Sequence, residues 1–240
     1  MTRPYFVRAD FFINVLLFLV VFGAVLEKTK ANDSIQVKKQ EILDLAKANT
    51  TNTENHKEVR QQLDQLVEEL TENKSTVTEE QWALYSPGSW RQIWSDEADN
   101  SPAGSPARNL DKIFQFVTEQ GRAVNFGERL LPDNQTITFA LEAVGQVTGN
   151  VQTTTILKAF SRPQGMQKGE LLSVLSADIL SGKLQDFQEI ELGEFPKGPI
   201  NAQSGLTILY LDEDLKVGTA PNVYSGESEM FVLERVSAVH

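Results

Sequence analysis

Two short stretches decide the fold of this chain: Gly-Ser-Trp-Arg-Gln-Ile-Trp at residues 88–94 and Met-Phe-Val-Leu-Glu-Arg-Val at residues 230–236. Each is a short apolar or alternating run of the kind that forms a β-strand. In a closed barrel the first and last strands are neighbours, so the Arg235 guanidinium can stack on the Trp90 ring and close one end. Such a cation–π contact is worth about 0.5–2 kcal/mol. Gly88 would leave room for the chain to turn.

The chain between these stretches is a series of short apolar or alternating runs, separated by turn residues such as Gly121 and Gly149-Asn150. Eight to ten strands at this spacing predict an antiparallel barrel or sandwich. The Gly-x-Trp…Arg pairing favours the barrel, and it is the arrangement of lipocalin-like proteins. We therefore expect a mainly β chain, with a lipocalin-like antiparallel β-barrel over residues 79–240. The expected strands are Ser89–Trp94, Lys112–Thr118, Arg122–Glu128, Thr136–Ala143, Thr153–Ser161, Leu171–Leu175, Phe187–Leu192, Gly205–Leu211, Leu215–Gly218 and Glu229–Val236.

Apolar side chains that share an alternation within these strands are candidates to line a cavity in the barrel. They are Phe114, Phe116, Val124, Phe126, Phe139, Leu141 and Phe160. Burying a hydrocarbon chain among them is favourable by about 0.8 kcal/mol per CH₂, so such a tunnel needs few polar contacts. The sequence leaves the alternative open, because a barrel of about eight strands can also be filled by its own side chains.

Residues 32–78 are expected to form a helical hairpin that leads into the barrel. Val59, Leu63, Leu66, Val67 and Leu70 recur at the spacing of one helical stripe. The stripe predicts packing against the following domain, since the segment has too few heptads to favour a partner-binding coiled coil. The strand expected at residues 205–211 is apolar on both faces, which indicates that the hairpin covers its outer side.

Residues 1–31 contain the uncharged run Phe-Phe-Ile-Asn-Val-Leu-Leu-Phe-Leu-Val-Val-Phe-Gly-Ala-Val-Leu at positions 11–26. At about 1.5 Å per residue this run spans roughly 24 Å as a helix, which is short of a hydrocarbon core of about 30 Å. We expect a thin or tilted single-pass membrane helix; the alternatives are a cleaved signal peptide and a buried core helix. Lys28, Lys30, Lys38 and Lys39 favour a body on the cytoplasmic side.

Composition excludes several classes of function. The 33 acidic residues outnumber the 22 basic ones, and the net charge of −11 argues against a nucleic-acid binder. The chain has no Cys and only two His, which excludes disulfides and thiolate catalysis and argues against a His-based triad or metal site. No nucleophile–base pair or phosphate-binding Gly loop is visible, so we expect neither an enzyme nor a cofactor or metal.

An acidic motif occupies the segment Tyr-Leu-Asp-Glu-Asp-Leu-Lys-Val at residues 210–217. Asp212, Glu213 and Asp214 lie together between two strand-like pieces. They are either a site for a hard cation or a basic partner, or a hairpin turn whose Asp side chains cap backbone N–H groups.

These motifs together resemble the plastid lipid-associated proteins, or plastid fibrillins, and their cyanobacterial relatives. Residues 210–217, followed by Met-Phe-Val-Leu at 230–233, are similar to the C-terminal signature of that family. Residues 87–95 resemble its Gly-x-Trp opening, and Phe114-Gln115 and Asn125 resemble the stretch that follows. The resemblance covers roughly residues 39–236, and it implies a lipocalin-like barrel at photosynthetic membranes that binds lipid, carotenoid or prenylquinone.

The expected function is therefore a membrane-tethered protein that binds or organises apolar lipids. A start without a plastid transit peptide suits the thylakoid of a cyanobacterium. The alternative is a non-enzymatic scaffold with a filled barrel, which docks a photosynthetic or lipid-biosynthetic protein partner.

Overall fold

The computed structural model describes residues 33–50, 54–72, 77–96, 107–131, 133–184, 186–190, 203–221 and 228–240. The chain forms two compact units, Met1–Glu41 and Ile42–His240. From Ile42 onward, the helical region expected at residues 32–78 belongs to the same unit as the β-sheet. That region holds a helix over residues 33–48 and α2 (His56–Thr71).

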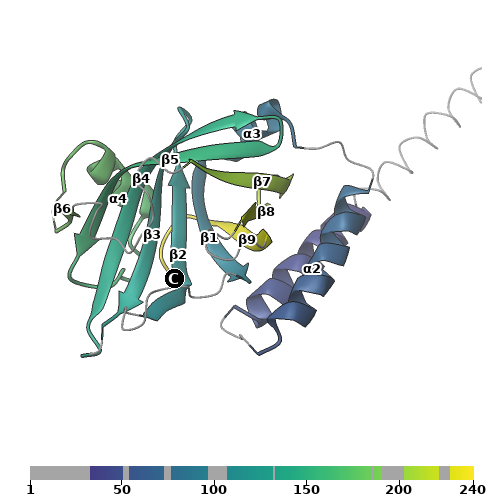
Figure 1. The fold of residues 1–240 in the computed structure, drawn as a ribbon, viewed down its shortest axis with the longest axis horizontal. Coiled ribbons are helices and arrows are strands. Elements are labelled where there is room, and N and C mark those ends of the chain that lie inside the picture. Colours follow the sequence, from purple (N-terminus) through teal and green to yellow (C-terminus); the bar gives the residue numbers. More distant parts are fainter. Residues whose placement is uncertain are drawn as a thin grey trace, which may run out of the picture. The chain divides into compact units, whose positions relative to one another are not determined.

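The described strands form one antiparallel sheet in which eight strands close a barrel, and this confirms the predicted mainly β barrel (Figure 1). Around the barrel the order is β4-β3-β2-β1-β9-β8-β7-β5, and β5 pairs with β4 to close it. The short strand β6 pairs with one end of β5. The strands are β1 (Gly88–Ser95), β2 (Ala107–Val117), β3 (Arg122–Leu130), β4 (Thr136–Thr148), β5 (Val151–Arg162), β6 (Gln188–Ile190), β7 (Gln203–Leu211), β8 (Leu215–Pro221) and β9 (Ser228–Val236).

The outer face of the barrel is identified by an ion-pair cluster beside the first helix. Arg91 on β1 lies directly opposite Glu234 on β9 and donates to it from Nε at 3.0 Å. Lys47, on the helix over residues 33–48, reaches the same carboxylate at 2.6 Å. Side chains that share this face through the strand pairing therefore also point outward, and they include Phe114, Phe126, Ala140 and Phe160.

The inner face consists of the residues that alternate with this outward set. Trp90 is paired with Gln115, and Gln115 is paired with Asn125. Asn125 in turn lies opposite Leu141, and Leu141 lies opposite Ala159. All five side chains point into the barrel, because pairs directly opposite each other in a sheet share one face.

A second hydrophobic core lies outside the barrel wall, beneath α4 (Leu172–Leu180). Leu172 and Ile179 pack on the buried outer side chains of β2 to β5. The strand predicted at Leu171–Leu175 is wrong, because this segment begins α4. Its apolar residues continue at the 3.6-residue spacing through Leu175 to Ile179, and a run of five residues is too short to separate strand from helix.

The stripe of α2 packs as predicted, with Val59, Leu63, Val67 and Leu70 buried. The helix lies against β7, the strand expected to be covered on its outer side. Arg60 fixes it to the barrel through the Asp96 carboxylate and the Ser228 carbonyl, and the His56 ring meets the outward Trp94 ring edge-on at 5.8 Å.

Sequence reasoning missed a short helix, α3 (Glu79–Tyr85), in the region expected to be all β. Thr78 and Gln81 form a capping box, in which each side chain accepts from the other residue's backbone N–H. Val77, Trp82 and Tyr85 join Trp90 and Ile208 in a cluster that seals one end of the barrel. The Thr-x-x-Gln spacing was the available signal.

The expected localisation is corrected. The run at residues 11–26 lies outside the described residues. Within the part of the chain that the structure describes, no helix combines the length and apolar character that crossing a bilayer requires. This finding overturns the expectation of a single-pass membrane protein with its body on the cytoplasmic side of a thylakoid.

The assignment of faces predicts unequal costs for two Phe→Ala substitutions on adjacent strands. Phe160→Ala should lower the free energy of unfolding by about 3–5 kcal/mol, because Phe160 is buried under α4 and its removal leaves a cavity in a packed core. Phe139, which points inward and is partly exposed, should cost only about 1–2 kcal/mol. Urea unfolding of both variants measures the difference. A larger loss for Phe139→Ala would contradict the register.

Candidate functional site

The closed end of the barrel has a floor built on Trp90 and Arg235. These residues lie opposite each other on β1 and β9, and the guanidinium carbon of Arg235 lies 4.2 Å from the centre of the Trp90 ring. The structure thus brings together the two residues that the sequence paired. Arg235 also donates to the carbonyl of Pro87 at 2.7 Å and to those of Tyr85 and Glu213. One side chain therefore ties α3, β1 and the β7–β8 turn to the last strand.

Gly88 permits this approach. Its φ is +121°, in the region that favours glycine, and a Cβ at this position would collide with the Arg235 guanidinium. The chain can therefore pass from α3 into β1 directly beneath the arginine.

The acidic motif forms the turn between β7 and β8. Asp212 accepts from the backbone N–H of Asp214 at 2.9 Å and of Leu215 at 3.0 Å, and from the Tyr210 hydroxyl at 2.7 Å. Burial and the neighbouring Asp212 raise the pKa of Tyr210. The geometry is that of an Asx-type hairpin turn. Among the described residues, no cluster of three or more Asp, Glu or His side chains is arranged to hold a metal ion.

Lys216 completes the floor, and sequence reasoning did not single it out. Its residue surface is only 1% exposed, and its ammonium lies 4.6 Å from the Trp90 ring centre and 5.8 Å from that of Trp82. Nζ donates across the barrel to Gln115 Oε1 at 2.6 Å, and Gln115 Nε2 donates to Asn125 Oδ1 at 2.9 Å. The alternation of β8 was the available signal, because it places Lys216 between the outward residues Leu215 and Val217.

Burial in this setting disfavours the charged form of Lys216. Desolvation, and secondarily the positive charge of Arg235, lowers the pKa of Lys216 to about 7. Within the described residues, no carboxylate forms a salt bridge with this amine. Buried ammonium groups of this kind are uncommon, since a lysine is rarely fully buried without a partner.

Above the floor, many of the inward side chains are only partly buried. Gln115 and Asn125 are among these partly buried residues, and so are large apolar residues from four strands. The apolar residues are Ile113, Phe139, Leu141, Ile156, Phe231 and Leu233. These inward apolar side chains are therefore less completely covered than the core outside the wall.

The seven predicted lining residues do not line one cavity, and this part of the prediction is corrected. Phe139 and Leu141 point inward. Phe114, Phe116, Val124, Phe126 and Phe160 share the outward face, and all of these except Phe116 are buried in the core beneath α4. Alternation separates the two faces of a strand, but it does not indicate which one faces the barrel axis when both are covered.

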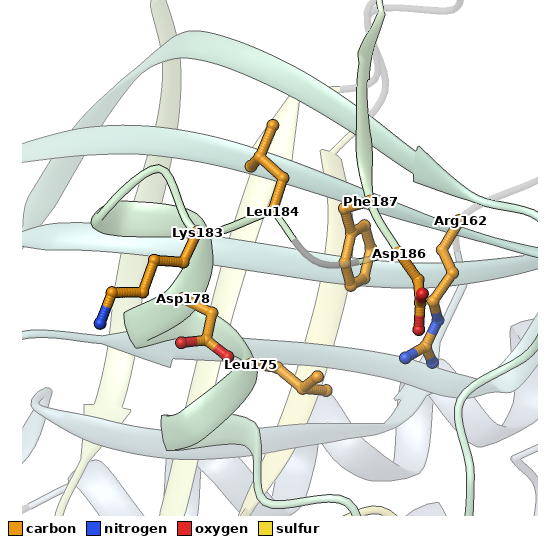
Figure 2. A pocket seen from close by; sticks show the side chains of 7 residues that line it. All are labelled: Arg162, Leu175, Asp178, Lys183, Leu184, Asp186 and Phe187. Carbon is orange, nitrogen blue, oxygen red and sulfur yellow. The ribbon is translucent and has the colours of Figure 1, made fainter.

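Two hollows lie beside the helices α4 and α3. Figure 2 shows one beside α4, between Arg162, Leu175 and Phe187; its volume of about 20 Å³ has room for little more than a water molecule. The other is a cleft of about 220 Å³ between α3 and the β2–β3 turn, bordered by Trp82 and Gly121. It is smaller than the clefts that usually hold drug-sized ligands.

The site is thus the closed end of an eight-stranded antiparallel barrel, with a Trp–Arg stack between its first and last strands. No family model and no curated protein matches the sequence. One solved structure that it matches is described as a lipocalin-like protein from Bacteroides uniformis. The match covers 62% of this chain and 97% of the other, with 13% identity and a TM-score of 0.29. At that score the likeness carries no weight, and the barrel architecture rests on the strand order and register.

Substituting Lys216 by Met should stabilise the protein near pH 7 by about 1–4 kcal/mol, because it replaces a buried, unpaired charge by an apolar group of similar length. The folded-state pKa lies below the unfolded value. Wild-type stability should therefore fall as pH decreases from about 10 to about 7, by up to about 1.4 kcal/mol per pH unit.

Urea unfolding between about pH 7 and about pH 10 measures both effects, since the Met variant should lack this part of the slope. Lys168→Met, at an exposed position, is the matched control and should follow the wild-type curve. A destabilised Lys216→Met protein with an unchanged slope would contradict the assignment of a depressed pKa.

Proposed function

We propose that the protein binds an elongated apolar ligand inside its barrel. The supporting observation is that β2 to β5 bury outward side chains such as Phe114, Phe126 and Phe160 almost completely and leave large inward apolar side chains partly exposed. Removing apolar surface from water is favourable, so covering these side chains with a hydrocarbon ligand should contribute about 25 cal/mol per Å² of apolar area buried.

The barrel has the form that such binding requires. Its floor is built from α3, Trp90 and Arg235, and the proposed ligand enters from the opposite end. The core beneath α4 lies outside the wall, so the barrel does not depend on its contents for a hydrophobic core.

The resemblance to the plastid lipid-associated proteins narrows the proposed ligand to an acyl lipid, a carotenoid or a prenylquinone. A hydrocarbon chain fits inward residues such as Phe139, Leu141 and Phe231, and the polar groups at the floor offer contacts to one head group. We propose a binding protein and not an enzyme, because association with an apolar chain requires only these surfaces.

Adding volume to the interior should block this binding. Full-length wild-type protein should enhance the fluorescence of the neutral apolar probe N-phenylnaphthylamine, and Phe139→Trp should weaken its affinity at least about tenfold, a loss of about 1.4 kcal/mol. Phe116→Trp makes the same change on the outer face, and this control should bind like the wild type. Mass spectrometry of organic extracts from the purified chain would identify a natural ligand.

Failure of the wild-type protein to bind the probe would contradict the proposal. It would favour the alternative of a filled barrel that serves as a docking scaffold. Equal losses in the two Trp variants would show that the effect is not specific to the interior.

A further inference from the structure

We propose that the ligand carries a carboxylate, and that Lys216, together with Gln115 and Asn125, binds this head group at the floor of the barrel. The inference rests on the proposed binding function and specifies its chemistry. Of the acyl lipids, carotenoids and prenylquinones proposed above, this inference favours an acyl ligand with a free carboxylate, such as a fatty acid or a comparable apolar acid.

The first support is that Lys216 uses only part of its hydrogen-bonding capacity. An ammonium has three donors, and the described contacts provide one acceptor, the Gln115 side-chain carbonyl. Buried polar groups are normally satisfied, so a buried amine with one neutral acceptor has capacity for a further partner. The two Trp rings attract its charge without accepting a conventional hydrogen bond.

The second support is the sign of the charge at this end of the interior. The floor contains two cations, Lys216 and Arg235, around the Trp90 ring. Among the described residues facing Lys216, β9 contributes Arg235 and Leu233, β7 contributes Leu211, and β2 contributes the neutral Gln115. The acids of the β7–β8 turn act electrostatically on Arg235. Asp212 also accepts hydrogen bonds from the backbone N–H groups of Asp214 and Leu215 in its own turn. A ligand anion at the Lys216 amine would therefore meet a cation that no acid among these residues faces.

A carboxylate fits this site better than a neutral head group does. A quinone or alcohol oxygen can accept a hydrogen bond from Lys216, but it leaves the buried charge uncompensated. A carboxylate supplies both acceptors and the opposite charge, and charge-assisted hydrogen bonds are about twice as strong as neutral ones. Gln115 Nε2 and Asn125 offer amide donors beside it, and an unsubstituted carotenoid hydrocarbon has no group for any of them.

The route to Lys216 passes the amide pair. Gln115 and Asn125 are partly exposed to the interior, whereas Lys216 is almost fully buried beneath them. A head group first meets the amides and reaches Nζ when the Gln115 carbonyl moves aside. Rotation of this side chain replaces a neutral acceptor of Lys216 by a charged one, while the Trp90 floor stays in place.

Binding should be coupled to protonation of Lys216. In the empty barrel the pKa of Lys216 is about 7, and a bound carboxylate favours the ammonium and raises it. The carboxylate therefore binds with uptake of a proton at neutral and mildly alkaline pH, so its affinity falls as pH rises above about 7. The other charged group facing Lys216, Arg235, stays protonated throughout this range because an arginine titrates only far above it.

The experiment compares dodecanoate, dodecanol and methyl dodecanoate as ligands of the full-length protein, each below its aggregation limit. Calorimetric titration at about pH 6.5 should show dodecanoate binding at least tenfold more tightly than dodecanol. At about pH 9 the dodecanoate affinity should be at least tenfold weaker than at pH 6.5, whereas the affinities of the two neutral ligands should not change.

Two variants distinguish a charge from a shape effect. Lys216→Met should reduce dodecanoate binding at pH 6.5 to the level of dodecanol. Lys216→Arg should retain tight dodecanoate binding but lose the pH dependence, since a guanidinium stays charged at pH 9. If the Met variant unfolds, Gln115→Leu provides a second test and should weaken dodecanoate more than dodecanol.

The outcomes separate this inference from the function on which it rests. Equal affinities for dodecanoate and dodecanol at both pH values would overturn the carboxylate site and leave apolar binding intact. An Arg variant with the wild-type pH dependence would overturn the role of Lys216. Absence of binding by all three ligands would overturn the proposed function and this inference with it.

Discussion

The stack of Arg235 on Trp90 is the contact on which the rest of the barrel depends. It joins the first and last strands at the position where an open sheet would have two edges, and closing the sheet removes the hazard of unpaired edges. The same arginine holds carbonyl groups of Tyr85, Pro87 and Glu213, so it orders the approach of α3 and the β7–β8 turn. The Asx-type turn at Asp212 contains the Glu213 carbonyl that accepts from Arg235. Gly88, with its positive φ, leaves room for the guanidinium.

With one end fixed in this way, the barrel obtains much of its hydrophobic stability outside its own wall. Phe114, Phe126 and Phe160 pack under α4, and α2 buries its stripe beside β7. A barrel that relied on a packed interior would lose that packing when a ligand entered. Separating the core from the interior lets the inner face carry amides, small residues and partly exposed apolar groups at little cost to the fold. This arrangement makes binding compatible with a stable empty state.

The sequence predicted the strands and the Trp90–Arg235 pair because both follow from local pattern and from barrel closure. It did not predict which face of β2 and β3 points inward, because that depends on α4. The beginning of α4 was itself predicted as a strand over Leu171–Leu175, because so short an apolar run does not distinguish a strand from a helix. Lys216 was not predicted as a site residue for a different reason: it follows the three acids at residues 212–214, and that pattern predicts a solvated turn. A lysine in a strand is ordinarily a surface residue, and only the pairing of β8 with β7 and β9 places this one inside.

The cost of burying Lys216 argues that it does more than support the fold. A Met or Leu at this position would fill the same space above Trp90 without a desolvation penalty, and replacing buried charges by apolar groups is often neutral or stabilising. Strongly perturbed ionisable groups are enriched at functional sites, although structural networks also perturb them. Lys216 belongs to no ion-pair network among the described residues; its hydrogen bond runs to Gln115 and from there to Asn125, at the accessible floor of the interior. The buried ammonium of Lys216 carries a desolvation penalty, and the proposed carboxylate ligand would offset it on binding.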